Sequence, residues 1–172
     1  MIKARDLARL SMCVAMLIGG QLALSALSGI EVVTVLLLCF AFSYGWRDGI
    51  LIAVVFSILR CFIFGFQVNV IILYLIYYPA FALFFAWLGT RLKGEIRYKE
   101  LGIVVGSAIL FTVSFTMLDN ALSALFFGLT AAGAKAYFIA SLYTLVPHVA
   151  CVTVTVAIFF LPLTRVINRI GK

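Results

Sequence analysis

The chain has 172 residues, of which 66% are hydrophobic and only 11% are charged, and its mean hydropathy is +1.24. An ordinary soluble domain carries about 25% charged residues, so the composition excludes that class. The net charge of +7 could indicate a nucleic-acid partner. Basic residues that flank apolar segments are, however, typical of membrane proteins that meet anionic lipid headgroups. We therefore expect an integral membrane protein that contacts the lipid bilayer and binds no nucleic acid.

Six apolar stretches follow one another along the chain, and each approaches the ~20 residues that cross a bilayer as a helix. They cover residues 10–28, 31–45, 49–66, 69–90, 101–128 and 136–163. Six such spans use ~120 positions and leave no room for a soluble catalytic or nucleotide-binding module. The sequence predicts an all-α polytopic membrane protein with six transmembrane helices in a single membrane domain, residues 1–172.

The basic residues indicate how the chain is oriented in the membrane. An even number of spans puts both termini on the same side, together with the turn around residues 44–49 and the charged loop 91–100. That side holds Lys3, Arg5, Arg9, Arg47, Arg91, Lys93, Arg97, Lys99, Arg165, Arg169 and Lys172. The opposite side holds only Lys135, and Arg60 lies within a span. The positive-inside rule then predicts cytoplasmic termini in a multi-pass protein of a prokaryotic plasma membrane.

The first span carries a stripe of small residues at four-residue spacing. Its members are Ser11, Ala15, Gly19 and Ala23. Small side chains on one helix face allow another helix to approach closely, which is how helices associate in lipid. The stripe either packs within this bundle or docks on a separate membrane subunit.

The sequence contains no arrangement that indicates catalysis. No activated nucleophile, phosphate-cradling glycine loop or paired carboxylates can be found, so we expect no enzyme, no catalytic residue and no cofactor. Cys13, Cys39, Cys61 and Cys151 lie in four different spans without CxxC spacing. We expect them to pack as small apolar residues and expect no metal site.

Polar residues inside the spans gather in the half of the membrane opposite the termini, whereas the other half is close to purely apolar. The candidate substrate-binding residues are Glu31, Arg60, Asn69, Tyr74, Tyr77, Asp119, Asn120 and His148. An ionisable side chain in hydrocarbon costs at least ~2.5 kcal/mol, so each must face protein or water. Arg60 and Asp119 either form a buried ion pair between the third and fifth spans or contact a polar ligand from outside.

The aromatic and histidine candidates also leave alternatives open. Tyr74, Tyr77 and Tyr78 either belong to an interfacial aromatic belt or form a platform for a flat heterocycle. His148 follows Pro147, so it either bonds locally at a helix break or contacts the ligand. A polar pocket that is open outward and sealed inward is typical of a binding subunit.

Three short segments resemble one family of such subunits. They are residues 29–34, reading GIEVVT, the Phe64-Gly65-Phe66 segment followed by Asn69, and Pro147-His148. Together with the length, the six spans and the small-residue stripe, they make the chain similar to the S components of energy-coupling factor (ECF) vitamin transporters. Within that family the chain looks most similar to the branch for cobalamin or its precursor alpha-ribazole.

The resemblance implies a mechanism. An S component of an ECF-type ABC importer captures a vitamin-like small molecule at the outer face. It docks on a scaffold transmembrane subunit through its first helix and topples when two cytoplasmic ATPase subunits hydrolyse ATP. The stripe of the first span would be the docking surface, and Glu31, Asn69, Asp119, Asn120 and His148 would line the site.

Two alternatives stay open. A buried Arg60 suits an anionic vitamin such as pantothenate. The chain could also be a self-sufficient small secondary transporter or channel.

Overall fold

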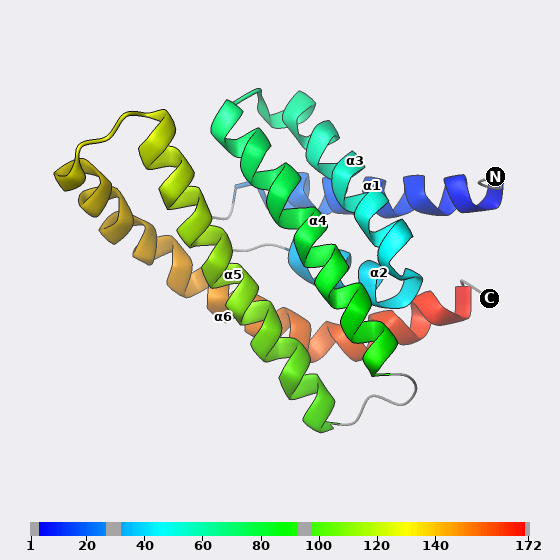
Figure 1. Ribbon diagram of the computed structural model, residues 1–172. Helices are drawn as coiled ribbons and strands as arrows, with labels where there is room; N and C mark the ends of the chain where they lie inside the picture. The colour runs from blue at the N-terminus through cyan, green and yellow to red at the C-terminus, as the bar shows by residue number, and fades with distance from the viewer. Residues whose placement is uncertain (1–3, 27–31, 93–97, 171–172) are drawn as a thin grey trace.

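The computed structural model describes residues 4–26, 32–92 and 98–170, and within them the protein is all-helical (Figure 1). The six helices are α1 (Ala4–Leu24), α2 (Val33–Tyr44), α3 (Trp46–Phe64), α4 (Val68–Arg91), α5 (Tyr98–Phe126) and α6 (Ala131–Ile170). Four of them, α1, α4, α5 and α6, are long and apolar enough to cross a membrane. The expectation of an all-α protein suited to membrane insertion is therefore confirmed at this level.

The other two helices depart from the simple picture of six similar spans. Helix α2 has only 12 residues, which is about 18 Å of helix against a hydrocarbon core of about 30 Å. Helix α3 has 19 residues but carries Arg47, Asp48 and Arg60. Hydropathy alone detects an apolar stretch, but it does not report where the backbone turns. Here α2 ends at Tyr44 because Gly45, with φ of +86°, reverses the chain into α3.

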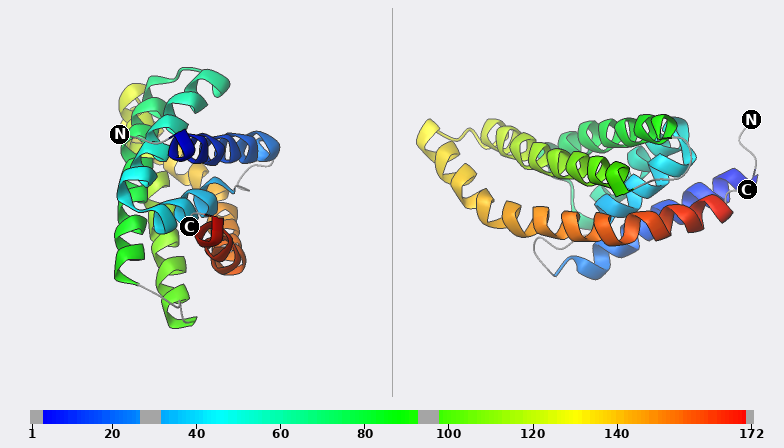
Figure 2. Two further views of the ribbon diagram at one scale, coloured as in Figure 1. Left: turned by 90° about the vertical axis from the view of Figure 1, so that its right-hand side faces the viewer. Right: turned by 90° about the horizontal axis from the view of Figure 1, so that it is seen from below.

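Helix α6 is also longer than the sequence predicted. It runs for 40 residues, continues through both Pro147 and Pro162, and bows along its length (Figure 2). Residues 136–163 were expected to span, with a break at Pro147 as one account of His148. The structure instead continues the helix through Pro147. A proline removes one backbone hydrogen bond, and neighbouring helices can support the rest.

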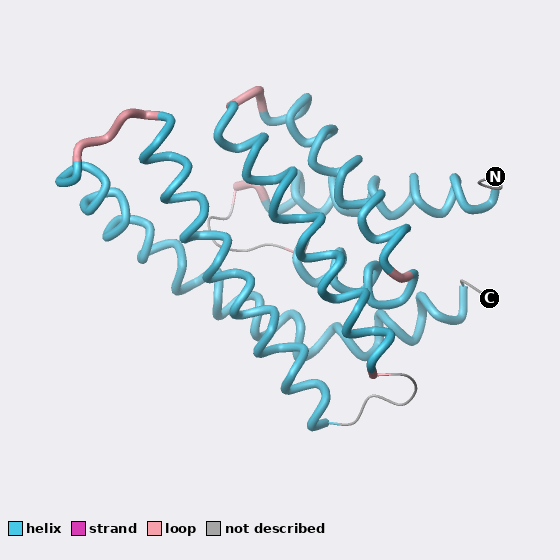
Figure 3. The backbone as a smooth tube through the Cα atoms, viewed as in Figure 1, coloured by secondary structure: helices cyan, strands magenta, loops and turns pink. Residues whose placement is uncertain are grey.

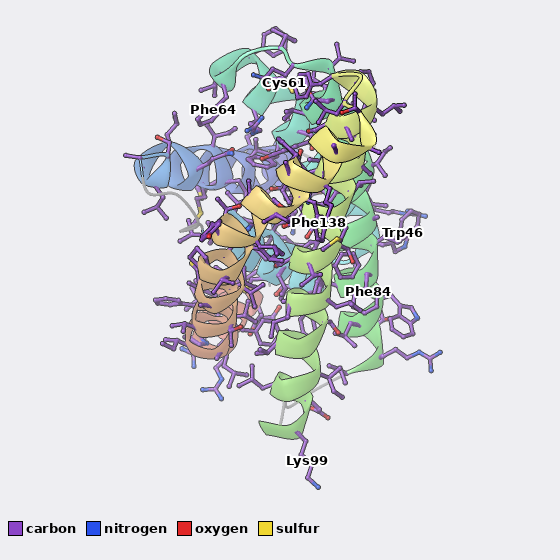
Figure 4. All side chains as sticks on the ribbon, turned by 90° about the vertical axis from the view of Figure 1, so that its left-hand side faces the viewer. Trp46, Cys61, Phe64, Phe84, Lys99 and Phe138 are labelled. Atoms are coloured by element: carbon purple, nitrogen blue, oxygen red, sulfur yellow. The ribbon has the colours of Figure 1, made fainter. Side chains whose placement is uncertain are left out.

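The helix ends sort into two groups. The start of α1, the Gly45 turn and the end of α6 lie toward the right of Figure 3, and the end of α4 and the start of α5 lie at its bottom. The end of α1, the α3–α4 loop and the α5–α6 loop lie toward the upper left. Figure 4 likewise places Phe64 at the end of α3 and Lys99 at the start of α5 at opposite ends of the molecule. We call the end with Lys99 the basic end and the other the polar end.

The short helix α2 is the centre of the packing. Eight of its residues are buried, and it contacts α1, α3, α4 and α6. Three glycines face it from three different helices. A Cβ on Gly20 of α1 would lie 2.7 Å from Val32, one on Gly49 of α3 would lie 3.1 Å from Ala41, and one on Gly89 of α4 would lie 2.5 Å from the Phe42 carbonyl oxygen. Close approach at glycine is the means by which apolar helices associate in lipid.

Between α4 and α5 the core is aromatic. Tyr77 and Phe81 of α4 pack against Phe111 and Phe115 of α5, with ring centroids 4.8 to 6.1 Å apart across the two helices. Edge-to-face aromatic pairs of this kind favour one rotational setting of each helix. The aromatic contacts therefore fix which face of α5 points toward α4.

The small stripe of α1 does not pack within the described bundle. Ser11, Ala15, Gly19 and Ala23 are all exposed, and a Cβ on Gly19 would meet no atom within 4 Å. Its neighbour Gly20 makes the close contact instead. Within the described residues, the alternative of packing inside this bundle is thus wrong for the stripe.

Gly89→Ala should destabilise the protein, because the new methyl group would overlap backbone atoms of α2 that have no room to move. We expect the free energy of unfolding to fall by about 1 to 3 kcal/mol. Gly106→Ala is the matched control on α5, where nothing lies within 4 Å, and it should be neutral or stabilising by up to about 1 kcal/mol. Thermal unfolding in detergent, followed by the reaction of a thiol dye with the cysteines, measures both. Equal melting temperatures for the two variants would contradict the close approach.

Candidate functional site

A small cavity in the middle of the bundle brings together residues from four helices. It measures about 30 Å³ and is lined by Thr34 of α2, Tyr74, Tyr77 and Tyr78 of α4, Thr112 and Phe115 of α5, and His148 of α6. Tyr77 lies nine residues into α4, about 14 Å along the helix from the polar end. Three predicted site residues, Tyr74, Tyr77 and His148, thus meet at one place.

The tyrosines of this cavity are buried, so they are not residues of a lipid-facing belt. Tyr74, Tyr77 and Tyr78 are exposed by only 7%, 7% and 4%. Their rings contact one another and Phe115, with centroids 4.8 Å apart for both the Tyr74–Tyr78 and the Tyr77–Phe115 pairs. Each hydroxyl is attached to a ring held by its neighbours, which leaves the cluster little freedom to rearrange.

Arg60 lies next to the cavity and stacks on its wall. Its guanidinium carbon is 4.1 Å from the ring centroid of Tyr74 and 5.2 Å from that of Phe64. The side chain is half-buried, and its Nε atom is buried without a hydrogen-bond partner among the described residues. A desolvated guanidinium over an aromatic face is stabilised by cation–π attraction, but the unused Nε–H donor remains available to an acceptor.

The structure separates Arg60 from Asp119, and the two do not form an ion pair. Asp119 instead accepts a hydrogen bond from Ser123, one turn further along α5. The Oγ atom of Ser123 in turn accepts a hydrogen bond from Nδ2 of Asn69 at 3.3 Å. The alternative of a buried Arg60–Asp119 pair is therefore wrong, and Asn69 and Asp119 belong to a polar link between α4 and α5.

Asn120 takes part in a second link, between α5 and α6. Its Nδ2 donates to Ser141 Oγ at 2.8 Å, and Ser141 donates to the Phe138 carbonyl at 2.7 Å. The Oδ1 atom of Asn120 is buried and has no partner within the described residues. The two asparagines thus hold helices together near the polar end, whereas the tyrosines and His148 surround the cavity.

Glu31 lies outside the described residues. The cavity also contains residues that the set of candidates omitted, namely Thr34, Tyr78, Thr112 and Phe115. A sequence pattern could have found part of this face. Thr112, Thr116, Asn120 and Ser123 recur every three or four positions in α5, and all four are buried. A polar stripe at helical spacing within an apolar span predicts the face that points into the protein.

Across the described part of the chain, no three His, Cys, Asp or Glu side chains gather as a metal site would need. Comparison with protein-family models, with curated proteins and with solved structures found no match to this chain. The residues of the cavity and Arg60 define the chemistry of the site. These offer hydroxyls, an imidazole and a guanidinium around aromatic rings, which suits hydrogen bonding and stacking.

Ser123→Ala should lower the stability of the protein, because it removes the group that joins Asn69 to Asp119. We expect the free energy of unfolding to fall by about 1 kcal/mol, which is the usual contribution of a hydrogen bond between helices in lipid. Ser114→Ala is the matched control on the same helix, since this exposed serine bonds only to Leu110 of its own helix. Thermal unfolding of the two variants in detergent tests the link, and equal melting temperatures would show that it carries no stability.

Proposed function

We propose that this protein is a membrane-embedded binding subunit that captures a small vitamin-like molecule. In detail, it is the S component of an ECF-type importer, with six membrane passages and cytoplasmic termini. The observation that carries the proposal is the meeting of Tyr74, Tyr77 and His148 with two threonines at one buried place. An ionisable side chain inside a membrane-spanning helix is rare and is by default a candidate for a functional site.

The proposed ligand is flat and carries hydrogen-bond acceptors. Tyrosine rings stack well on heterocycles, and the hydroxyls and the imidazole fix orientation. A cobalamin-like molecule or alpha-ribazole matches the resemblance in the sequence. An anionic vitamin such as pantothenate is the second candidate, because Arg60 keeps a buried Nε donor beside Tyr74.

The size of the cavity sets a condition on the proposal. About 30 Å³ accommodates roughly one water molecule, whereas ligand pockets usually measure about 300 to 1,000 Å³. Binding therefore requires the helices around the cavity to separate. The α5–α6 pair is the best candidate for that movement, because α6 packs on α5 and α2, and its start stands apart from α4 in the right-hand view of Figure 2.

The proposed assembly uses the exposed stripe of α1. Ser11, Ala15, Gly19 and Ala23 would form the contact with a scaffold transmembrane subunit, whose two cytoplasmic ATPases would supply the energy. The chain itself offers no nucleotide-binding module. We accordingly propose that it is not an enzyme, and that it acts in a prokaryotic plasma membrane.

Arg60→Ala and His148→Ala should each weaken ligand binding at least about tenfold, because each removes a polar contact from a desolvated site. Arg91→Ala is the matched control. Arg91 also stacks on an aromatic ring, with 5.4 Å between its guanidinium carbon and the Trp87 centroid, but it lies at the basic end. Calorimetry with cobalamin, alpha-ribazole and pantothenate measures the affinities. Unchanged affinity in both site variants would place the binding site elsewhere.

Ala15→Trp and Gly19→Trp should abolish co-purification with a scaffold subunit and leave ligand affinity unchanged, because a bulky side chain would block close helix approach. Met16→Trp is the control, since Met16 is exposed on a different face of α1. Concentrative uptake into vesicles that contain this chain alone would favour the self-sufficient transporter instead.

A further inference from the structure

Two grooves flank α1, and they differ in charge. One, about 490 Å³, lies between α1 and α3 and has no charged side chain in its lining. The other, about 420 Å³, lies between α1 and the last turns of α6, with α2 as its floor. We call the second the α1–α6 groove. Its lining is apolar except at the basic end, where Arg5, Arg9 and Tyr44 contribute.

The length of the α1–α6 groove along α1 is similar to the thickness of one membrane leaflet. Along α1 its wall runs through Arg5, Arg9, Met12 and Met16, one turn after another. From Arg5 to Met16 the helix rises about 16 Å, and half of a hydrocarbon core is about 15 Å. The floor follows the same order, since Tyr44 is at the basic end of α2 and Leu36 is two turns deeper.

The two arginines at the basic end of the groove, Arg5 and Arg9, differ in their ion-pair partners. Arg9 Nη2 lies 2.6 Å from Asp48 and 3.6 Å from Asp6, and its guanidinium carbon lies 4.5 Å from the Tyr44 centroid. Its charge is therefore already compensated. Arg5 is exposed and forms no ion pair with any described residue.

Further positive charge lies on α6, but outside the lining of the groove. Arg165 and Arg169 are exposed on the last turns of α6, beside the lining residues Val166 and Ile167. The basic end of the groove therefore combines an apolar slot with the guanidinium of Arg5, which forms no ion pair with the described residues. A basic pocket between helices at the cytoplasmic side is the arrangement that binds anionic lipid headgroups.

We propose that the α1–α6 groove binds one anionic phospholipid of the leaflet at the basic end. An acyl chain occupies the slot, and the phosphate lies against Arg5. Two methionines line the wall, and their flexible side chains can adapt to an acyl chain that has no fixed shape. The inference rests on the membrane insertion in the proposed function but not on its vitamin site, because the groove and the cavity share no lining residue.

Native mass spectrometry of the purified full-length protein tests this with phosphatidylglycerol and phosphatidylcholine of identical acyl chains. We expect one tightly retained lipid and a preference for phosphatidylglycerol. Arg5→Gln should reduce that preference about fivefold, the contribution of one basic residue at an anionic lipid surface. Ala8→Trp should fill the groove and lower retention of both lipids. Ala15→Trp is the matched control, because it adds the same volume to the other groove.

Equal retention of the two lipids by the unmodified protein would overturn the proposal, as would equal effects of the two tryptophan variants. If Ala8→Trp fails to fold, the Arg5→Gln comparison decides alone. A third result would also overturn it: loss of scaffold co-purification in Ala8→Trp with unchanged lipid retention would mean that a protein helix occupies the groove. Calorimetry with the vitamins on the same samples shows separately whether the proposed function fails.

Discussion

The enclosure of α2 is the constraint on which the rest of the structure depends. Lipid provides no hydrophobic force that would drive apolar helices together, so contact depends on how closely their backbones can approach. Gly20, Gly49 and Gly89 provide that approach from three helices around one short helix. Helix α2 is only 12 residues long, so the longer helices around it extend beyond its ends. It supplies the surface on which α1, α3, α4 and α6 all pack. Each of these glycines therefore affects the position of a whole helix.

Once the helices are this close, every polar side chain between them needs a partner. Asn69, Ser123 and Asp119 satisfy one another across α4 and α5, and Asn120 pairs with Ser141 across α5 and α6. These contacts hold the polar end together and are a matter of stability. The groups around the central cavity are of another kind, because they surround space. A ligand that enters there would exchange contacts with the cavity wall and leave the helix links in place, provided that α5 and α6 move as a pair.

Much of the fold could be predicted from the sequence, because hydropathy over a window of helix length depends on composition alone. Hydropathy found the long helices, and the turn residues at 44–49 indicated the reversal at Gly45. The true length of α2 and the continuity of α6 through Pro147 could not be, since both depend on support from neighbouring helices. The site was predicted in part for the same reason. Depth along a helix follows from residue number, which identified Tyr74, Tyr77 and His148. Rotation of a helix follows from packing, and only packing directs Asp119 to Ser123 and away from Arg60.

The rotation of α1 about its own axis determines which of its faces are exposed. It is fixed at the basic end by the Arg9–Asp48 pair and near the polar end by the contact of Gly20 with Val32. Two fixed points set its rotation, and that rotation turns two different faces outward. The small stripe offers a surface on which another helix can pack closely, whereas the face with Arg5 borders the α1–α6 groove. In the two proposals, the protein partner contacts the face of α1 that holds Ser11 and Ala15, and the lipid contacts the face that holds Arg5, Met12 and Met16.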